Sequence, residues 1–488
     1  MAAASARGGG RDRQRANCAL SIARAAGERR AETRARSRLS GRVCRCGGSK
    51  GGARRFWAWA RIHYAPRASR RQRARRRDGQ RAREHGVTPW LSVIGIGEDG
   101  ILGLAPAACT LIETAEVLVG GARHLGMVPG HDAERILWER PLARTIDAIE
   151  TRRGARVTVL ASGDPMWYGV GATLARRFSP EEMTVVPQRS AFSLAAARLG
   201  WPLADCATIT LHGRPLDTLR LHLAPTRRIL ILSEDGGTPR EVAALLTGLG
   251  WGPSRISVLA HLGGSRETIV ADEARAWGDR PAPDLNTIAI ACSPGRGARA
   301  LPRSAGLPDD VFEHDGQLTK REVRAATLAA LAPLPGETLW DVGAGCGSIA
   351  IEWLRQDEGR SAIAIERDPA RAAMIARNAA ALGVPELRIA FGTAPEAFEG
   401  LPQPDAIFLG GGIGAASLLR QAWASLPPGG RLVANVVTTE AEARLLDWHA
   451  RHGGALTRIG VSRAEPAGTH HLWRPLATVT QLAAVKPG

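Results

Sequence analysis

The sequence predicts an α/β protein with largely parallel sheets in two domains, and two observations support this prediction. Apolar runs of strand length alternate with segments of helical period from about Trp90 onward. Such alternation is typical of strands that form parallel sheets with helices packed on the faces. A stretch rich in Pro and Gly at 293–308 divides the pattern, as a linker does. We therefore expect two folded domains, at 89–292 and 309–488.

Seven apolar runs predict the strands of the first domain. They lie at 91–94, 115–119, 157–160, 184–186, 229–232, 256–259 and 287–290. Segments 191–199 and 239–249 between them have the helical period.

The second domain repeats the alternation with cleaner spacing. A helix is expected over 319–332. Strands are expected at 338–341, 362–366, 388–391, 406–409 and 432–437, with a final pair near 456–463 and 477–482. About seven strands with helices between them suffice for one doubly wound, Rossmann-like domain of roughly 180 residues.

The net charge of +18 lies almost entirely at the N-terminus. Residues 1–89 hold 24 Arg, one Lys and five acids, a net charge of +20, so the other 399 residues sum to −2. This distribution argues against nucleic-acid binding by the folded body.

Residues 1–88 are predicted to be a disordered, Arg-rich extension, because they carry too few apolar residues to repay the entropy of ordering. Three interpretations stay open: a basic arm that binds RNA or acidic surfaces, an Arg-rich targeting peptide, or an upstream extension translated from a misassigned start. We favour the last, because the composition looks unselected.

The cysteine pattern predicts neither disulfides nor a metal site. The seven cysteines are odd in number and scattered, and no second Cys pair completes the isolated Cys44-x-Cys46 as a zinc site. Free thiols suit a reducing cytoplasm. No run of 18 apolar residues and no signal-peptide pattern occurs. We therefore expect a cytoplasmic protein without metal or membrane contact.

A glycine loop in the second domain predicts a cofactor site. Asp341 ends a strand, glycines follow at alternate positions, and a helix begins near Ser348. Glycines let the backbone approach a ligand closely, and the helix N-terminus offers free N–H groups. The G-x-G-x-G spacing differs from the G-x-G-x-x-G of dinucleotide folds and favours S-adenosylmethionine. The expected contacts are Gly343, Ala344, Gly345, Cys346 and Gly347.

Two later positions extend this site. Glu366 ends the next strand, where an acid can accept hydrogen bonds from ribose hydroxyls. Thr393 and Ala394 follow the strand after that, where the adenine would lie. The alternative is a glycine-rich turn followed by an ordinary surface acid. Loop, acid and strand order together favour the cofactor site.

The loop after the fourth strand suggests the kind of substrate. Nucleic-acid amino-methyltransferases carry an Asn/Asp-Pro-Pro-aromatic motif there, whereas this chain has glycines that include Gly410 and Gly411. The difference weakens an RNA- or DNA-modifying function and suits a bulky ligand close to the backbone.

The first domain carries a different pair of signatures. Residues 95–100 match G-x-G-x-x-G, but no ribose-binding acid ends the second strand, so a dinucleotide site is not expected. The run Gly163-Asp164-Pro165 with Tyr168 follows another strand. Turn chemistry alone would also explain Gly-Asp-Pro.

These motifs resemble known families. Gly95 and Gly97 with the 163–169 run are similar to the tetrapyrrole (corrin/porphyrin) methylases, which have two α/β lobes with S-adenosylmethionine in the cleft between them. The second half, from the 309–320 segment through the glycine loop to Glu440, resembles the decarboxylating precorrin methyltransferase domain. The resemblance covers roughly residues 89–485. It implies a two-lobed tetrapyrrole methylase fold followed by a Rossmann-like class I methyltransferase fold.

The resemblance also implies a reaction of cobalamin biosynthesis. Two methyl groups pass from S-adenosylmethionine to carbons 5 and 15 of precorrin-6B, and the ring C acetate loses carbon dioxide, which gives precorrin-8. One cofactor per domain is implied. Thr319 joins the second-domain contacts above, and Gly163, Asp164, Pro165 and Tyr168 line the other cofactor cleft. Glu366 stands where many relatives have Asp.

The substrate's carboxylates call for basic side chains. Arg214 and Lys320, with Gly410 and Gly411, are the predicted substrate contacts, and Arg189 and Arg321 are further candidates. Ordinary solvated charge explains each equally well. The sequence singles out no catalytic acid or base. We expect a small-molecule partner, no nucleic acid, and a homo-oligomer. The alternatives are an RNA methyltransferase with a basic RNA-binding arm and a non-catalytic scaffold.

Overall fold

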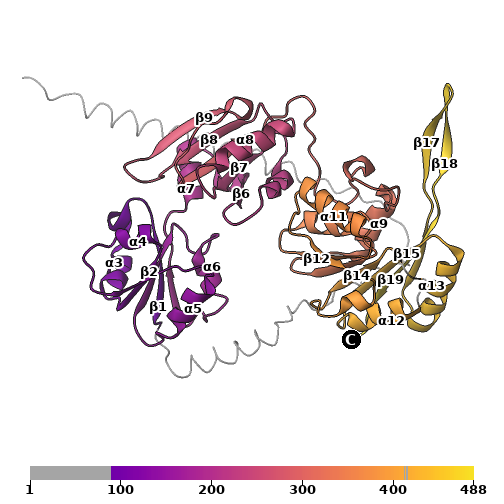
Figure 1. Cartoon of the computed structure of the whole chain (residues 1–488), viewed down its shortest axis with the longest axis horizontal. Coiled ribbons are helices and arrows are strands. Elements are labelled where there is room, and N and C mark those ends of the chain that lie inside the picture. The colour runs from indigo at the N-terminus through magenta and orange to yellow at the C-terminus, as the bar shows by residue number, and fades with distance from the viewer. Residues whose placement is uncertain (1–88, 412, 414–415) are drawn as a thin grey trace, which may run out of the picture. The chain divides into compact units, whose positions relative to one another are not determined.

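The computed structural model describes residues 89–411, 413 and 416–488 (Figure 1). These residues form two five-stranded sheets, one seven-stranded sheet and a two-stranded hairpin. The α/β fold class is confirmed. The predictions for residues 1–88 lie outside the described residues.

The first sheet is entirely parallel, in the order β3-β2-β4-β1-β5. Its strands are β1 (Leu91–Ile96), β2 (Val117–Gly120), β3 (Glu134–Leu137), β4 (Val157–Ser162) and β5 (Met183–Val186), and its helices are α3 (Pro106–Glu113), α4 (Ala122–Gly126), α5 (Ala143–Glu150) and α6 (Val170–Leu174). Strand β3 was not predicted because three of its four residues are exposed and it lacks a buried apolar run.

The second sheet has the order β6-β7-β10-β8-β9, and only its β6–β7 pair is parallel. The expectation of largely parallel strands was wrong here. Seven residues join β8 to β9, too few for the crossover that parallel neighbours need. The strands are β6 (Cys206–Thr210), β7 (Arg228–Leu232), β8 (Arg255–Ala260), β9 (Thr268–Glu273) and β10 (Asn286–Ala291), with helices α7 (Ala191–Leu199) and α8 (Thr238–Gly248).

The third sheet has the order β13-β12-β11-β14-β15-β19-β16, with five parallel strands and an antiparallel pair at one edge. Its strands are β11 (Thr338–Val342), β12 (Ser361–Glu366), β13 (Arg388–Phe391), β14 (Ala406–Leu409), β15 (Arg431–Val436), β16 (Ala455–Ile459) and β19 (Val479–Val485). Its helices are α9 (Arg321–Leu331), α10 (Ser348–Gln356), α11 (Pro369–Ala381), α12 (Ala416–Ser425) and α13 (Thr439–His452). The strand order reverses between β11 and β14, where open α/β sheets bind ligands.

The predicted strand at 456–463 was wrong in its second half. After β16 the chain enters a separate hairpin of β17 (Ser462–Ala467) and β18 (His470–Pro475), which projects from the seven-stranded sheet (Figure 1). Both strands are largely exposed, so they lack the apolar alternation that predicts a half-buried strand.

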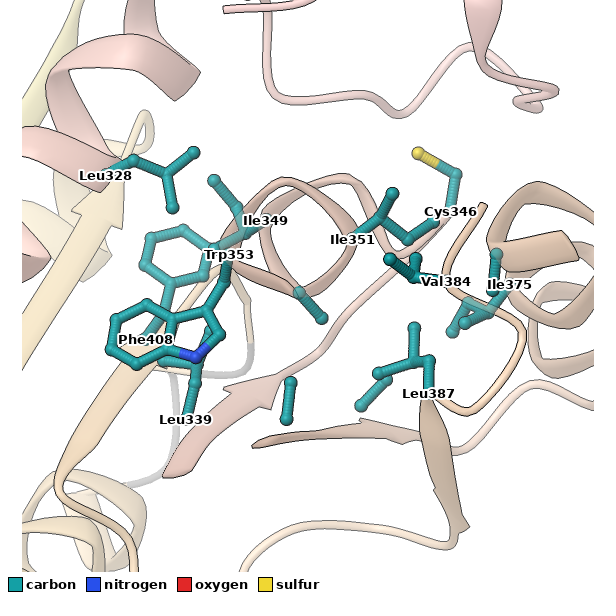
Figure 2. Packing of buried hydrophobic residues seen from close by; sticks show 14 of the residues in the cluster. Leu328, Leu339, Cys346, Ile349, Ile351, Trp353, Ile375, Val384, Leu387 and Phe408 are labelled. Carbon is teal, nitrogen blue, oxygen red and sulfur yellow. The ribbon is translucent and has the colours of Figure 1, made fainter. Parts of the chain in front are cut away.

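The core beneath the glycine loop is built around Trp353 of α10. Its indole is fully buried in one cluster with Leu328, Leu339 and Phe408 (Figure 2). A buried aromatic of this size contributes roughly 1.5–3 kcal/mol. This packing holds α10, and therefore the loop that precedes it, against the sheet.

Candidate functional site

A cavity of about 760 Å³ lies at the carboxyl ends of β11, β12 and β14, within the 300–1,000 Å³ usual for small-molecule sites. Five separate segments of the chain contribute predicted residues to its wall. The predicted residues that line it are Thr319, Lys320, Gly343, Ala344, Gly345, Cys346, Glu366, Thr393, Ala394, Gly410 and Gly411. The structure thus brings together predicted positions almost a hundred residues apart.

Gly347 is not among the lining residues. It caps the N-terminus of α10 with a φ of +80°, and a Cβ there would lie 2.9 Å from Cγ2 of Ile375. A glycine is required at position 347 because of the turn into α10 and because α11 packs closely against it. Arg321 is exposed and also absent from the cavity wall.

Glu366 braces the glycine loop. Its Oε2 accepts a hydrogen bond of 2.9 Å from the N–H of Gly345, and its Oε1 accepts bonds of 3.0 Å from the N–H groups of Arg367 and Asp368. Each carboxylate oxygen keeps acceptor capacity beyond these bonds. That Glu366 also binds a ribose stays a prediction.

Asp341 is a site residue that the list of expected contacts omitted. Its carboxyl is 1% exposed and lines the cavity. Oδ2 accepts a hydrogen bond of 3.0 Å from the N–H of Ala350, whereas Oδ1 has no partner. Burial raises the pKa of Asp341 to about 7, opposed by the Ala350 bond and reinforced by the charge of Glu366. Its place at a strand end, directly before the glycines, was the available signal.

The Cys346 side chain lines the cavity as a neutral thiol and does not act as a nucleophile. Its thiol is buried, and burial raises the pKa of this group above its ordinary value. A thiol is a weak nucleophile until it loses its proton.

A second cavity, of about 1110 Å³, lies in the first domain. Gly163, Asp164 and Tyr168 line it, as do Arg189 and Arg214. Pro165 does not belong to this wall. It is buried beneath the helix start, where a Cβ on Gly169 would lie 2.6 Å from its carbonyl oxygen.

Tyr168 lies beside Arg214 in this cavity. Tyr168 has a φ of +56°, its hydroxyl donates to the carbonyl of Thr208 at 3.0 Å, and the Arg214 guanidinium lies 5.8 Å from the ring centroid. A non-glycine residue with positive φ often marks a functional position. The Asp164 Oδ1 accepts from the N–H of Met166 at 2.9 Å, which fixes the turn.

Sequence reasoning missed a polar cluster in the same cavity. His124 Nε2 lies 2.9 Å from Ser162 Oγ, and Arg123 contacts both His124 and Glu98. Burial lowers the pKa of His124 to about 4, which Arg123 reinforces. No motif spacing connects these residues, which come from α4, the last residue of β4 and the loop after β1.

Neither a cluster of metal-ligating residues nor a membrane-spanning helix is found among the described residues. Within this part of the chain, no three or more His, Cys, Asp or Glu residues group as a metal site. None of the helices that the structure describes is long and apolar enough to cross a bilayer.

Family models match both folded parts of the chain. The family model for tetrapyrrole (corrin/porphyrin) methylases matches residues 91–276. The model for the precorrin methyltransferase domain matches residues 310–486. Each match contains one of the two cavities' main loops.

Two curated relatives extend along almost the whole described chain. The precorrin-6Y C(5,15)-methyltransferase [decarboxylating] of a Sinorhizobium species is 51% identical over 401 residues, 82% of this chain and 97% of the relative. The protein of that name from Mycobacterium tuberculosis (strain CDC 1551 / Oshkosh) is 43% identical over 81% of this chain and 99% of the relative. A Pyrobaculum aerophilum relative, named a probable cobalt-precorrin-6B C(15)-methyltransferase (decarboxylating), is 35% identical over 186 residues, 37% of this chain and 95% of its own length. The chain is therefore a methyltransferase and belongs to the family of decarboxylating precorrin-6Y C(5,15)-methyltransferases.

Proposed function

We propose that this enzyme methylates carbons 5 and 15 of precorrin-6B with S-adenosylmethionine and removes carbon dioxide from the ring C acetate, giving precorrin-8 in cobalamin biosynthesis. The names of the Sinorhizobium and Mycobacterium relatives support this assignment. These relatives act on tetrapyrroles by name and give no support to the RNA-modifying alternative.

The partnerless oxygen of Asp341 is the observation that carries the cofactor assignment. A buried carboxylate is costly unless a positive group or a donor pairs with it. Asp341 Oδ1 has no partner and lies in the cavity wall. S-adenosylmethionine carries positive charge at its sulfonium and its amino group, so it would supply the positively charged partner that Asp341 Oδ1 does not have within the protein.

The residues present fit this cofactor. The cofactor supplies a methyl group activated by the sulfonium, so the protein's task is chiefly to align donor and acceptor. Around the cavity, the glycine loop would hold the methionine part, Glu366 the ribose, and Thr393 with Ala394 the adenine, while Thr319 closes the wall. A second S-adenosylmethionine would bind in the first domain beside Gly163, Asp164 and Tyr168.

We assign the two methylations to separate domains. The first domain, 89–292, would methylate carbon 5, and the second, 309–488, would methylate carbon 15 and decarboxylate, with 293–308 as linker. The two family matches, at 91–276 and 310–486, lie within these limits, one in each proposed domain. The Pyrobaculum relative supports the division, because a protein of about one domain's length carries the C(15) decarboxylating name.

Basic side chains in each cavity suit a polycarboxylate substrate. Arg214 lines the cavity of the first domain, and Lys320 lines the cavity of the second domain, as do Gly410 and Gly411. Arg214 is well placed to pair with a carboxylate because its guanidinium already stacks on Tyr168.

We further propose a cytoplasmic homo-oligomer. The cysteines of the described chain are free thiols, as a reducing compartment permits. The β17–β18 hairpin carries Leu472 and Trp473, which are 55% and 74% exposed, and a second copy would cover them. Light scattering of W473S tests this: the particle mass should fall relative to the parent chain, and an unchanged mass would exclude the hairpin as the contact.

One assay tests the reaction. The full chain is incubated with precorrin-6B and S-adenosylmethionine, and the product is weighed. A gain of two methyl groups with loss of carbon dioxide is expected. A gain of one methyl would leave one domain without its proposed role, and an unchanged substrate would favour the scaffold. RNA binding that weakens with salt and survives removal of residues 1–88 would favour the RNA alternative.

A further inference from the structure

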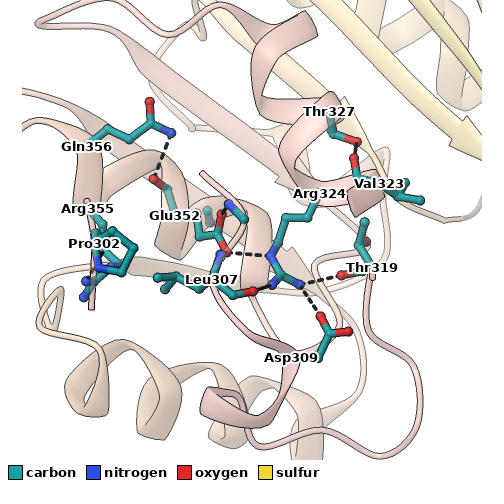
Figure 3. A network of polar contacts seen from close by, with 12 residues as sticks. Pro302, Leu307, Asp309, Thr319, Val323, Arg324, Thr327, Glu352, Arg355 and Gln356 are labelled. Atoms are coloured by element: carbon teal, nitrogen blue, oxygen red, sulfur yellow. Dashed lines mark hydrogen bonds and ion pairs between the residues drawn. The ribbon is translucent and has the colours of Figure 1, made fainter. Parts of the chain in front are cut away.

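Arg324 of α9 is a fully buried arginine that does not line the cofactor cavity (Figure 3). All three nitrogens of its guanidinium donate hydrogen bonds. Its Nε donates to Glu352 Oε1 at 2.6 Å. Its Nη1 donates to the Thr319 carbonyl at 2.5 Å and to Asp309 Oδ1 at 3.2 Å, and its Nη2 donates to the Leu307 carbonyl. One planar guanidinium therefore holds three points of the segment that precedes α9.

Glu352 completes this arrangement from α10, the helix that follows the glycine loop. Its carboxylate is 1% exposed. Besides Arg324, it accepts hydrogen bonds from the N–H groups of Gly306 at 2.6 Å and Leu307 at 2.9 Å. A buried pair of charges persists only when its remaining donors and acceptors are also satisfied. Here the groups that satisfy them belong to the same segment.

We call residues 306–320 the strap. Its last part, 316–320, lines the cofactor cavity. A Cβ on Gly345 would lie 3.7 Å from the carbonyl oxygen of Gln317, so the strap faces the glycine loop across a short gap. The width of the cavity at this point depends on where the strap is held.

A second buried side chain ties the strap to the glycine loop directly. Asn378 of α11 accepts from the N–H of Glu313 at 2.8 Å and donates to the carbonyls of Glu313 at 2.8 Å and Cys346 at 3.0 Å. Cys346 belongs to the glycine loop. One amide therefore fixes the middle of the strap relative to the loop that it faces.

We propose that Arg324 and Asn378 are positioning residues that hold the strap as a preformed wall of the S-adenosylmethionine site. This inference rests on the proposed function of that cavity. A wall fixed in advance spares the cofactor the entropy cost of ordering it. Neither side chain needs to touch the cofactor, since both act through the strap backbone.

Arg355 provides a matched control. It lies on α10 and, like Arg324 on α9, is nearly fully buried, and it donates to the carbonyls of Leu382, Leu301 and Pro302. None of these residues belongs to the strap or lines the cofactor cavity. R355K and R324K thus remove comparable buried guanidinium groups, and only the second frees the strap.

The test compares R324K, N378S and R355K in the full chain with precorrin-6B. Three quantities are measured: thermal stability, the KM for S-adenosylmethionine in forming the decarboxylated product, and hydrogen exchange of the strap amides 313–319. All three variants should lose stability. R324K and N378S should raise this KM about tenfold, with a smaller change in kcat, and speed strap exchange, whereas R355K should do neither. N378S serves if R324K fails to fold.

Two results would overturn the proposal. The first is an R355K variant that raises the KM as much as R324K and N378S do, which would show a general loss of stability. The second is an R324K or N378S variant in which the strap amides exchange faster while the KM for S-adenosylmethionine stays unchanged. If the parent chain gives no decarboxylated product and binds no S-adenosylmethionine, the proposed function itself fails, and this inference fails with it.

Discussion

Glu366 and Gly345 are joined by a hydrogen bond of 2.9 Å, from the Gly345 N–H to Oε2 of the carboxylate. The acid at the end of β12 therefore holds the loop that follows β11. Replacing Glu366 by Gln should weaken S-adenosylmethionine binding in the second domain by about tenfold, because hydrogen bonds to charged groups contribute about 1.5–3 kcal/mol. Calorimetric titration of the variant measures this. E337Q is the control, since Glu337 pairs with Arg431 outside the cavity; equal losses in both variants would contradict the assignment.

Asp341 should make cofactor binding depend on pH. Burial raises its pKa to about 7, and the ionised form is the one that attracts a cation. Affinity for S-adenosylmethionine in the second domain should therefore rise as the pH increases from about 6 to 8. D341N should bind weakly, with no such rise. A pH dependence that is the same in D341N would assign the titration to another group.

The same shift predicts how the stability of the empty protein depends on pH. The folded state holds the Asp341 proton up to about pH 7, whereas an unfolded Asp releases it near its ordinary pKa of 3.8. Between these values the folded state binds more protons, so the free energy of unfolding should fall as pH rises, by about 1.4 kcal/mol per pH unit. Chemical denaturation between about pH 4 and pH 7 should show that the free energy of unfolding falls less steeply with pH in D341N than in the parent chain. The same slope in both chains would contradict a raised pKa of Asp341.

Gly95 should be required for methylation by the first domain and should not be required for the reaction of the second domain. A Cβ at this position would lie 1.8 Å from the carbonyl oxygen of Gly163 and 2.8 Å from the N–H nitrogen of Gln188. Both are backbone atoms that cannot move aside easily. G95A should therefore abolish methylation at carbon 5 while carbon 15 is still methylated and the acetate removed. The product mass tests this, because a gain of one methyl group together with loss of carbon dioxide marks the second-domain reaction alone. Loss of both methylations would show that the domains do not act separately.

Much of the cavity around the glycine loop was predictable because the sequence signals for its wall are local. The strand, the glycines and the helix start occupy one short run, 338–348, and the acid of Glu366 ends the next strand. The exposed elements were not predictable, because β9 and β18 carry no apolar periodicity. The contacts of Arg324 also escaped prediction, since they join positions up to 28 residues apart. Long-range partners of this kind become visible only in the folded chain.

Gly345 and Gly347 should respond differently to the same substitution. Both have positive φ, +60° and +80°, a conformation that costs a residue with a Cβ about 1–2 kcal/mol. At Gly347 the new Cβ would also press on Ile375 at 2.9 Å, whereas at Gly345 the nearest atom lies at 3.7 Å. G347A should therefore lower the melting temperature more than G345A does. G345A should instead mainly reduce formation of the decarboxylated product, because only Gly345 lines the cavity. Thermal unfolding and product mass measured on both variants test this order, and a G345A chain that is less stable than G347A would contradict it.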